Sequence, residues 1–376
     1  MAQLRAQGVE AIVCAMSGNF VQRGDMAVVN KFARSEMAVR CGADLVLEIP
    51  TPWACATAET FARGGVQLLN STGVVTELAF GSECGDLEAM QTVADVLRSP
   101  QLADDIRREL ASGVTYALAR QQAVARHLGE TAQILRQSNN ILGIEYLKAL
   151  AQEASPLRPI TVSRLGAGHD DGAVVDGIAS GSYVRRLLYS GQTQEALALL
   201  PPVCGQILQR ELSAGRAPVA LAQMERAILS RLRQMPEEAF ARYDSGAEGL
   251  YHRLYKAVRQ ATSLSELYDL AKTKRYAHAR LRRMVLAAFL EMDAIPSRPP
   301  YLRVLAANET GRQLLRQMQK QGAKVLTKPA DVAQLGEEAE KLFAAESRWT
   351  DLYTLAYPSL KESVCGSDWR YQPIML

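Results

Sequence analysis

The first half of the chain alternates short apolar runs with amphipathic stretches. The apolar runs have the length of buried strands and occupy residues 11–16, 44–49, 76–80 and 159–163. Helical periodicity lies between them, at residues 30–40, 56–69, 87–97 and 102–150. Strands that alternate with helices over short connections predict an α/β fold, in which helices cover both faces of a parallel sheet.

The second half of the chain has a different pattern, because strand signals nearly disappear after residue 180. Amphipathic helices are predicted at residues 193–200, 221–234, 250–260, 263–271 and 276–292. Short strands are predicted only at 302–305 and within "AKVLTKP", residues 323–329. We therefore expect a domain boundary between about residues 190 and 202. It would separate an α/β domain over residues 1–195 from a mainly α-helical domain over residues 196–376.

Three loops that follow predicted strands are rich in glycine and small polar residues. They are Ser17-Gly18-Asn19, "GSECGD" at residues 81–86 and "RLGAGHDDG" at residues 164–172. Ligands of a parallel sheet bind beyond the carboxyl ends of its strands, and such loops let backbone N–H groups approach phosphate and ribose. Tight turns need glycine in any case, but three such loops at one sheet edge favour a nucleotide pocket. Neither a Walker A motif nor G-x-G-x-x-G follows a strand, so the pocket would be of another type.

Two further stretches combine helix-capping residues with candidate ligand contacts. "SNNILGIEYLKAL", residues 138–150, offers Ser138, Asn139 or Asn140 as an N-cap. Alternatively, one asparagine caps the helix and the other turns its amide toward a base or a ribose. "IASGSYVRRLL", residues 178–188, offers Ser180 or Ser182 as a cap, with Arg185 in the first turn. An arginine there opposes the helix dipole unless a phosphate lies opposite it; the alternative is an arginine that points into solvent.

The stretch "KTKRYAHARLRR", residues 272–283, segregates positive charge in a chain whose net charge is only +3. Its basic residues are Lys272, Lys274, Arg275, Arg280, Arg282 and Arg283, and no acid follows until Glu291. At helical spacing, Arg275, Arg282 and Arg283 can spread along one side. Most charge runs are solvated helix faces, but a run of one sign favours contact with a nucleic-acid backbone.

Composition narrows the remaining classes of protein. A chain of 376 residues with 48% hydrophobic and 22% charged residues suits two globular domains. Its six cysteines form no C-x-x-C pair and its four histidines form no cluster, so we expect neither a disulfide framework nor a metal site. Neither a membrane-spanning run nor a signal peptide is present. We expect a cytoplasmic protein without a membrane partner.

Seven motifs together resemble the tRNA(Met) cytidine acetate ligase family, and they follow its order over nearly the whole chain. They are "MSGNFVQRGD", "GADLVLEIP", "FGSECGD", "SNNILGIEYLKAL", "RLGAGHDD", "KTKRYAHARLRR" and "SRPPYLRVL". The resemblance implies a Rossmann-like nucleotidyltransferase domain that binds ATP, followed by a helical domain that binds tRNA. It also implies a ligase that converts ATP and acetate to acetyl-adenylate, with Mg²⁺ as a helper. The ligase then acetylates N4 of the wobble cytidine (C34) of elongator tRNA(Met), and no DNA partner is expected.

The resemblance also implies roles for individual residues. Gly81, Asn139 and Arg164 match ATP contacts of the family, with Asn140 as a rival for Asn139 because the register within the pair stays open. "SGSYVR" resembles an S-x-S-x-x-R phosphate motif and assigns Ser180, Ser182 and Arg185 to phosphates. The loop after the first strand supplies a candidate wall of the pocket, formed by Ser17, Asn19, Gln22 and Arg23. The six basic residues of 272–283 would face tRNA, and the catalytic residues stay unknown.

The sequence departs from the family at its start. The family begins with a strand and an H-x-G-H loop whose histidines stabilise the triphosphate, but the first histidine here is His127. We expect either a start assigned to an internal methionine, which we favour, or a true truncation that exposes strand edges. In both cases the chain as written should be catalytically impaired. The rival functions are a tRNA-binding homologue without catalysis and a small-molecule nucleotidyltransferase of the same fold.

Overall fold

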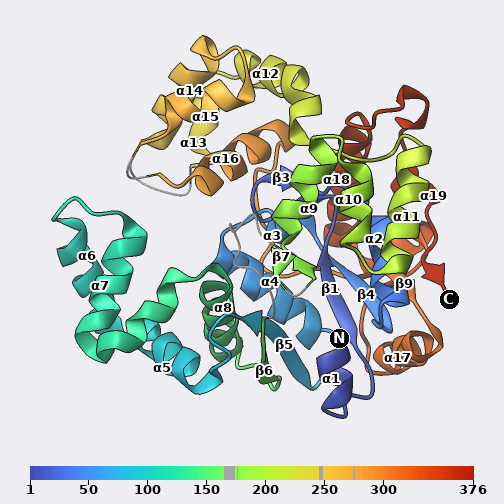
Figure 1. The fold of residues 1–376 in the computed structure, drawn as a ribbon, viewed down its shortest axis with the longest axis horizontal. Coiled ribbons are helices and arrows are strands. Elements are labelled where there is room, and N and C mark those ends of the chain that lie inside the picture. The colour runs from blue at the N-terminus through green and yellow to red at the C-terminus, as the bar shows by residue number, and fades with distance from the viewer. Residues whose placement is uncertain (165–173, 176, 245–248, 274–275) are drawn as a thin grey trace.

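The computed structural model describes residues 1–164, 174–175, 177–244, 249–273 and 276–376, and Figure 1 shows it as a ribbon. Lys274, Arg275 and most of the glycine-rich loop that begins at Arg164 lie outside these residues. In the described part of the chain, no helix is both long and apolar enough to cross a membrane.

The first two strands form a parallel pair, as the sequence predicts. β1 (Val13–Ser17) pairs with β4 (Leu45–Ile49), and Met16 lies opposite Glu48. All residues of β4 are buried, as expected for a strand that is covered on both faces. The crossover between them is α2 (Lys31–Arg40), and its N-cap is Asn30, whose side chain accepts a hydrogen bond from the Ala33 N–H.

The far end of the chain completes this sheet. β9 (Leu302–Ala307) pairs antiparallel with the other edge of β4, and β10 (Val325–Leu326) and β11 (Ile374–Met375) pair in parallel with β9. The predicted strands near residues 302 and 325 are therefore present. However, the sheet crosses the boundary expected near residue 195, so the second part of the chain is not helical throughout.

A second parallel pair, β5 (Glu77–Ser82) and β6 (Arg158–Ser163), forms a separate sheet. Within the described residues, β1 has no strand partner on its side away from β4, and β5 has none away from β6. A cavity of about 680 Å³ lies between the two pairs, and Val13 and Leu78 are among its lining residues. The predicted parallel sheet thus appears as two pairs with a gap between them.

Helices surround both pairs. Those of the first half are α1 (Ala2–Ala6), α3 (Thr51–Ala54), α4 (Ala58–Asn70), α5 (Leu87–Arg98), α6 (Pro100–Leu110), α7 (Tyr116–Leu128), the 3₁₀ helix η1 (Gly129–Arg136) and α8 (Ser138–Gln152). The short hairpin of β7 (Val174–Val175) and β8 (Ile178–Ala179) precedes α9 (Gly181–Tyr189), α10 (Thr193–Ala198) and α11 (Pro202–Ser213). The helices that follow β9 in the sequence are α17 (Glu309–Lys320), η3 (Pro329–Leu335), α18 (Glu337–Thr354), η4 (Leu360–Glu362) and α19 (Ser367–Arg370).

The predicted helical region gathers at one end of the molecule, in yellow to orange in Figure 1. It contains η2 (Leu221–Met224), α12 (Glu225–Gln234), α13 (Glu237–Ala241), α14 (Leu250–Gln260), α15 (Leu264–Ala271) and α16 (His278–Leu290). Its core is shared with the hairpin of β2 (Phe20–Val21) and β3 (Asp25–Met26), because Phe20 and Met26 are fully buried among these helices. The loop after β1 is therefore packed against the helical region.

The turn of this hairpin lies directly against α16. Gly24 has a φ of +69°, and a Cβ atom there would lie 2.4 Å from the backbone nitrogen of Arg283. The Arg283 guanidinium in turn donates a hydrogen bond to the Gln22 carbonyl at 3.3 Å. Glycine is thus needed both for the backbone conformation and for the close approach.

We predict that Gly24→Ala lowers the free energy of unfolding by more than about 1 kcal/mol, because it adds a steric clash to the left-handed strain. Chemical denaturation measures the loss. Gly322→Ala is the matched control, since Gly322 has a φ of +80° with nothing within 4 Å of a built Cβ. Equal losses in the two variants would contradict the close contact between the hairpin and α16.

Candidate functional site

A cavity of about 840 Å³ opens where β1 and β6 end. Ser17 is the last residue of β1 and Arg164 follows β6, and both line the cavity. The carboxyl ends of the two parallel pairs therefore meet at one place, which is where an α/β sheet binds its ligands.

The cavity brings together seven of the residues predicted from the sequence. They are Ser17, Gln22, Arg23, Arg164, Ser180, Ser182 and Arg185. Arg282 of the predicted tRNA-binding stretch also lines the cavity. The loops after β1 and β6 thus converge and α16 takes part, but no residue of the third predicted loop, 81–86, lines the cavity.

The described lining of the cavity is strongly positive. It includes one carboxylate, Asp25, and six arginines: Arg23, Arg34, Arg164, Arg185, Arg186 and Arg282. Cationic side chains that converge on a concave site attract anions and hold phosphate oxygens well. The charge of the cavity is therefore suited to a polyanionic ligand.

The N-terminus of α9 contributes directly to the cavity. Ser180 is its N-cap, since its Oγ accepts a hydrogen bond from the Tyr183 N–H at 3.2 Å, and the Ser182 Oγ lies 2.9 Å from the Ser180 Oγ. Arg185 is half-buried in the first turns of the same helix. Two hydroxyls, a helix N-terminus and a guanidinium therefore lie together, a combination that favours phosphate.

The start of α8 corrects the predicted cap. The helix begins at Ser138 after Gln137, and no side chain of Ser138, Asn139 or Asn140 caps it. Instead, the Glu83 carboxylate accepts the backbone N–H groups of Asn139 and Asn140. Burial alone would raise the pKa of the Glu83 carboxyl, but these bonds and the Asn139 side chain hold it below its usual value.

The two asparagines are not equivalent. Asn140 is fully buried, and its Oδ1 accepts the N–H groups of Glu83 and Cys84 at 2.8 and 3.1 Å. Its Nδ2 donates to the Ile134 carbonyl and the Gln137 Oε1. Asn139 is only half-buried. The Asn140 amide therefore has no capacity left for a ligand.

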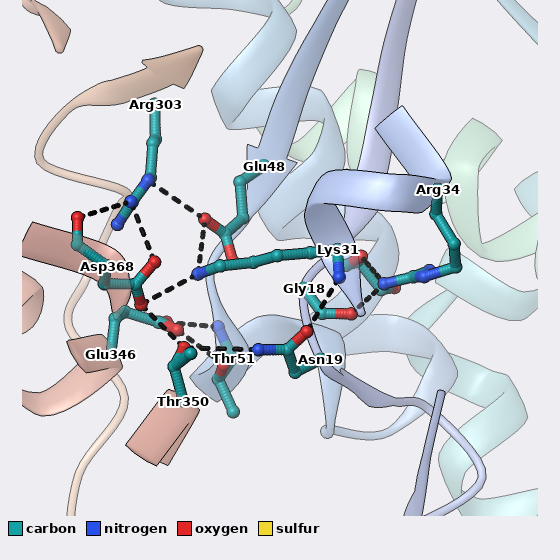
Figure 2. A network of polar contacts seen from close by, with 11 residues as sticks. Gly18, Asn19, Lys31, Arg34, Glu48, Thr51, Arg303, Glu346, Thr350 and Asp368 are labelled. Carbon is teal, nitrogen blue, oxygen red and sulfur yellow. Dashed lines mark hydrogen bonds and ion pairs between the residues drawn. The ribbon is translucent and has the colours of Figure 1, made fainter. Parts of the chain in front are cut away.

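Gly81 and Asn19 are not lining residues of the cavity. Gly81 lies in β5, where a built Cβ would be 3.5 Å from the Cγ of Arg164, so it adjoins a cavity residue. Asn19 is 2% exposed and turns its amide into the protein, as Figure 2 shows. Asn19 is therefore not part of the wall of this cavity, and both ends of its amide bind protein groups.

Arg34 is a cavity residue that sequence reasoning missed. Its guanidinium donates to the carbonyls of Ser17, at 2.8 Å, and of Gly18. The sequence did contain a pattern that points to Arg34, because Arg34 lies in the first turns of α2, as Arg185 does in α9. The same argument about an arginine near a helix start would have identified it.

In the basic stretch of residues 272–283, some side chains are exposed and others bind groups of the protein itself. Lys272 and Arg282 are exposed. Arg280 binds Asp244 at 2.9 Å, and Arg283 is half-buried against the hairpin. Burial lowers the pKa of the Arg283 guanidinium. Of the three arginines expected to spread along one side, Arg282 is exposed, Arg283 is covered by the hairpin and Arg275 lies outside the described residues.

A buried ionic network supports the loop after β1 (Figure 2). The Lys31 Nζ lies 2.9 Å from the Glu48 Oε1 and 3.1 Å from the Asp368 Oδ2, and Arg303 binds the Asp368 Oδ1 at 2.8 Å. A fifth member, Glu346, accepts the N–H and the hydroxyl of Thr51. Burial, together with the charge of Glu48, raises the pKa of Glu346 to about 8. With Glu346 protonated, two cations balance two anions.

Comparisons with known proteins indicate the family of the chain. Residues 2–368 match the family described as HIGH Nucleotidyl Transferase. The tRNA(Met) cytidine acetate ligase of Fervidobacterium nodosum is 34% identical over 96% of this chain and 92% of that protein. The enzyme of the same name from Caldanaerobacter subterraneus subsp. tengcongensis is 37% identical over 92% and 88%. A crystal structure of Thermotoga maritima TmcAL bound with alpha-thio ATP has a TM-score of 0.93 at 30% identity, over 100% of this chain and 94% of that one.

The protonated state of Glu346 makes stability depend on pH. Because its pKa in the folded protein, about 8, exceeds its ordinary value of 4.5, the folded state holds a proton between these pH values that the unfolded state releases. That contribution to stability is complete below about pH 4.5 and is lost as pH rises to about 8. We predict that the stability of Glu346→Gln relative to wild type increases as pH rises from 5 to 9, because the substituted side chain stays neutral. Thermal unfolding at several pH values measures this, and a constant difference in Tm would contradict it.

Proposed function

The chain belongs to the tRNA(Met) cytidine acetate ligase family, and from that premise we propose that it uses ATP to attach acetate to elongator tRNA(Met). The product is N4-acetylcytidine at the wobble position. The observation that carries the proposal is the arginine-lined cavity at the carboxyl ends of β1 and β6. The ATP-analogue complex of the Thermotoga maritima protein supports ATP as its ligand.

The ATP contacts that we propose follow the family motifs and the cavity. Arg164 and Arg185 bind phosphate oxygens, with the hydroxyls of Ser180 and Ser182 beside them. Gly81 and Asn139 approach the nucleoside. We favour Asn139 over Asn140, because four protein groups already use the Asn140 amide.

The first step joins two anions that repel each other. A carboxylate oxygen of acetate attacks the α-phosphorus of ATP, and the bond to the bridging oxygen breaks to release pyrophosphate. The arginines lower the cost of holding acetate close to ATP, and they stabilise the charge on the leaving pyrophosphate. In the second step, N4 of cytidine attacks the acetyl carbonyl, and AMP leaves while N4 loses a proton.

Mg²⁺ fits this site as a partner of the phosphates. Among the described residues, no group of three or more His, Cys, Asp or Glu side chains could hold a metal ion. Mg²⁺ is commonly held by one or two carboxylates together with substrate phosphates. Asp25 is the carboxylate among the described lining residues, and it would supply one ligand oxygen to Mg²⁺. The ATP phosphates would supply further ligand oxygens.

The tRNA contacts that we propose come from the end of α15 and from α16. Lys272 and Arg282 are exposed, so they can meet phosphates of the tRNA backbone. Arg282 also lines the ATP cavity, which brings the bound tRNA close to the activated acetyl group. Arg280 and Arg283 instead hold the helical region together and support the contact surface.

One sequence observation favours a second candidate, a tRNA-binding homologue with little or no catalysis. None of the four histidines lies in an H-x-G-H motif. We propose that the 376 residues bind ATP and tRNA but acetylate slowly. A small-molecule nucleotidyltransferase is less favoured, because it leaves the exposed side chains of Lys272 and Arg282 without a role.

The test incubates the 376-residue protein with ATP, acetate and tRNA(Met) transcript, and mass spectrometry of digested nucleosides then quantifies N4-acetylcytidine. We expect tRNA binding that weakens with salt and acetylation far slower than that of the Thermotoga maritima protein under the same conditions. Acetylation at the rate of that protein would refute the impairment. Failure to bind tRNA at low salt would refute the proposed function.

We also predict that Arg185→Ala weakens ATP binding about tenfold or more, because a hydrogen-bonded charge contributes about 1.5–3 kcal/mol. Isothermal titration calorimetry measures the affinity. Arg158→Ala is the matched control, since Arg158 lies at the opposite end of β6, pairs with Glu77 and is exposed. An unchanged affinity in Arg185→Ala would remove Arg185 from the phosphate site.

A further inference from the structure

Four buried residues close a ring of polar contacts beneath the loop after β1 (Figure 2). The Asn19 Oδ1 accepts the Lys31 N–H at 2.8 Å, and the Asn19 Nδ2 donates to the Thr350 Oγ1 at 3.2 Å. The Thr350 hydroxyl donates to the Asp368 Oδ2 at 2.6 Å, and that oxygen lies 3.1 Å from the Lys31 Nζ. We call Asn19, Lys31, Thr350 and Asp368 the buried ring.

The buried ring fixes the orientation of the Asn19 amide. Thr350 has one hydroxyl hydrogen, which it donates in its hydrogen bond to Asp368. Toward Asn19 the Thr350 hydroxyl can therefore act only as a hydrogen-bond acceptor. The opposite amide orientation would place Nδ2 against the Lys31 N–H and Oδ1 against an oxygen. Because the four residues are at most 3% exposed, such a mismatch would leave buried polar groups poorly paired and is disfavoured.

This orientation matters for the cavity because Asn19 stands two residues after Ser17. Arg34 holds the carbonyls of Ser17 and Gly18 from the cavity side. From the opposite side, Gly18 lies against the Glu48 carboxylate, where a built Cβ would be 2.4 Å from Oε1. The loop is therefore held on one side by the buried ring and Glu48, and on the other by Arg34.

We propose that Thr350 and Asp368 are positioning residues for the nucleotide site. They act through Asn19 and keep the loop of residues 17–19 in the place that ligand binding requires. Neither residue lines the cavity, and both come from the C-terminal segment, more than 300 residues after the loop. The proposal rests on the proposed binding of ATP in that cavity.

The key comparison is between two substitutions of Thr350. Thr350→Val keeps the shape of the side chain but removes the hydroxyl, whereas Thr350→Ser keeps the hydroxyl. We expect Thr350→Val to weaken ATP binding at least fivefold and Thr350→Ser to stay within twofold of wild type. Asp105→Asn is a control for lost stability alone, because Asp105 binds Arg108 and His127 on α6 and α7, away from the cavity. It should lower Tm without changing ATP affinity.

A second readout does not depend on ATP. Hydrogen–deuterium exchange of the backbone amides of residues 17–24 should be at least fivefold faster in Thr350→Val than in Thr350→Ser. If Thr350→Val does not fold, Thr350→Cys, whose thiol is a weak donor, replaces it with the same expected direction.

The outcomes separate the two proposals. Unchanged loop exchange in Thr350→Val, or wild-type ATP affinity despite a lower Tm, would show that the buried ring only stabilises the fold and would overturn the inference. Faster loop exchange in a protein whose wild type binds no ATP would refute the proposed function, while the control of the loop by the buried ring would stand.

Discussion

The arrangement of the nucleotide site depends on the ion pairs that Lys31 makes with Glu48 and Asp368. Lys31 lies on α2, Glu48 on β4 and Asp368 on α19, and all three are 2% exposed or less. Removing one partner of such a buried pair leaves an uncompensated charge, which commonly costs about 3–5 kcal/mol. Arrangements of the three elements that separate these charges are therefore strongly disfavoured.

This constraint explains why the C-terminal segment returns to the first sheet. β9 pairs with β4 and brings Arg303 to the same network, where its Nε lies 3.5 Å from the Glu48 Oε2. These contacts join residues far apart in the sequence, such as Lys31 and Asp368, so the position of the loop after β1 depends on the C-terminal segment. A protein divided into an ATP domain and an independent tRNA domain would lack this coupling.

Local patterns predicted most elements well. The strand at β4, the helix after Asn30 and the cap at Ser180 depend on residues close in sequence, and the structure confirms them. Contacts that join distant segments could not be predicted. Glu83 caps α8 from another loop, β9 pairs antiparallel with β4, and the hairpin at Gly24 covers Arg283. In each case the sequence showed a residue with suitable chemistry but not its partner.

The cavity also shows why its residues were only partly predictable. The loops after β1 and β6 were predicted to meet at one sheet edge, and Ser17 and Arg164 do so. Arg34 was missed although its position in α2 resembles that of Arg185 in α9. Both arginines lie near a helix N-terminus, where the helix dipole disfavours positive charge, and they face further arginines. An anion bound between them would relieve this repulsion. The same charges that lower the stability of the protein without ligand would therefore stabilise its complex with a polyanion.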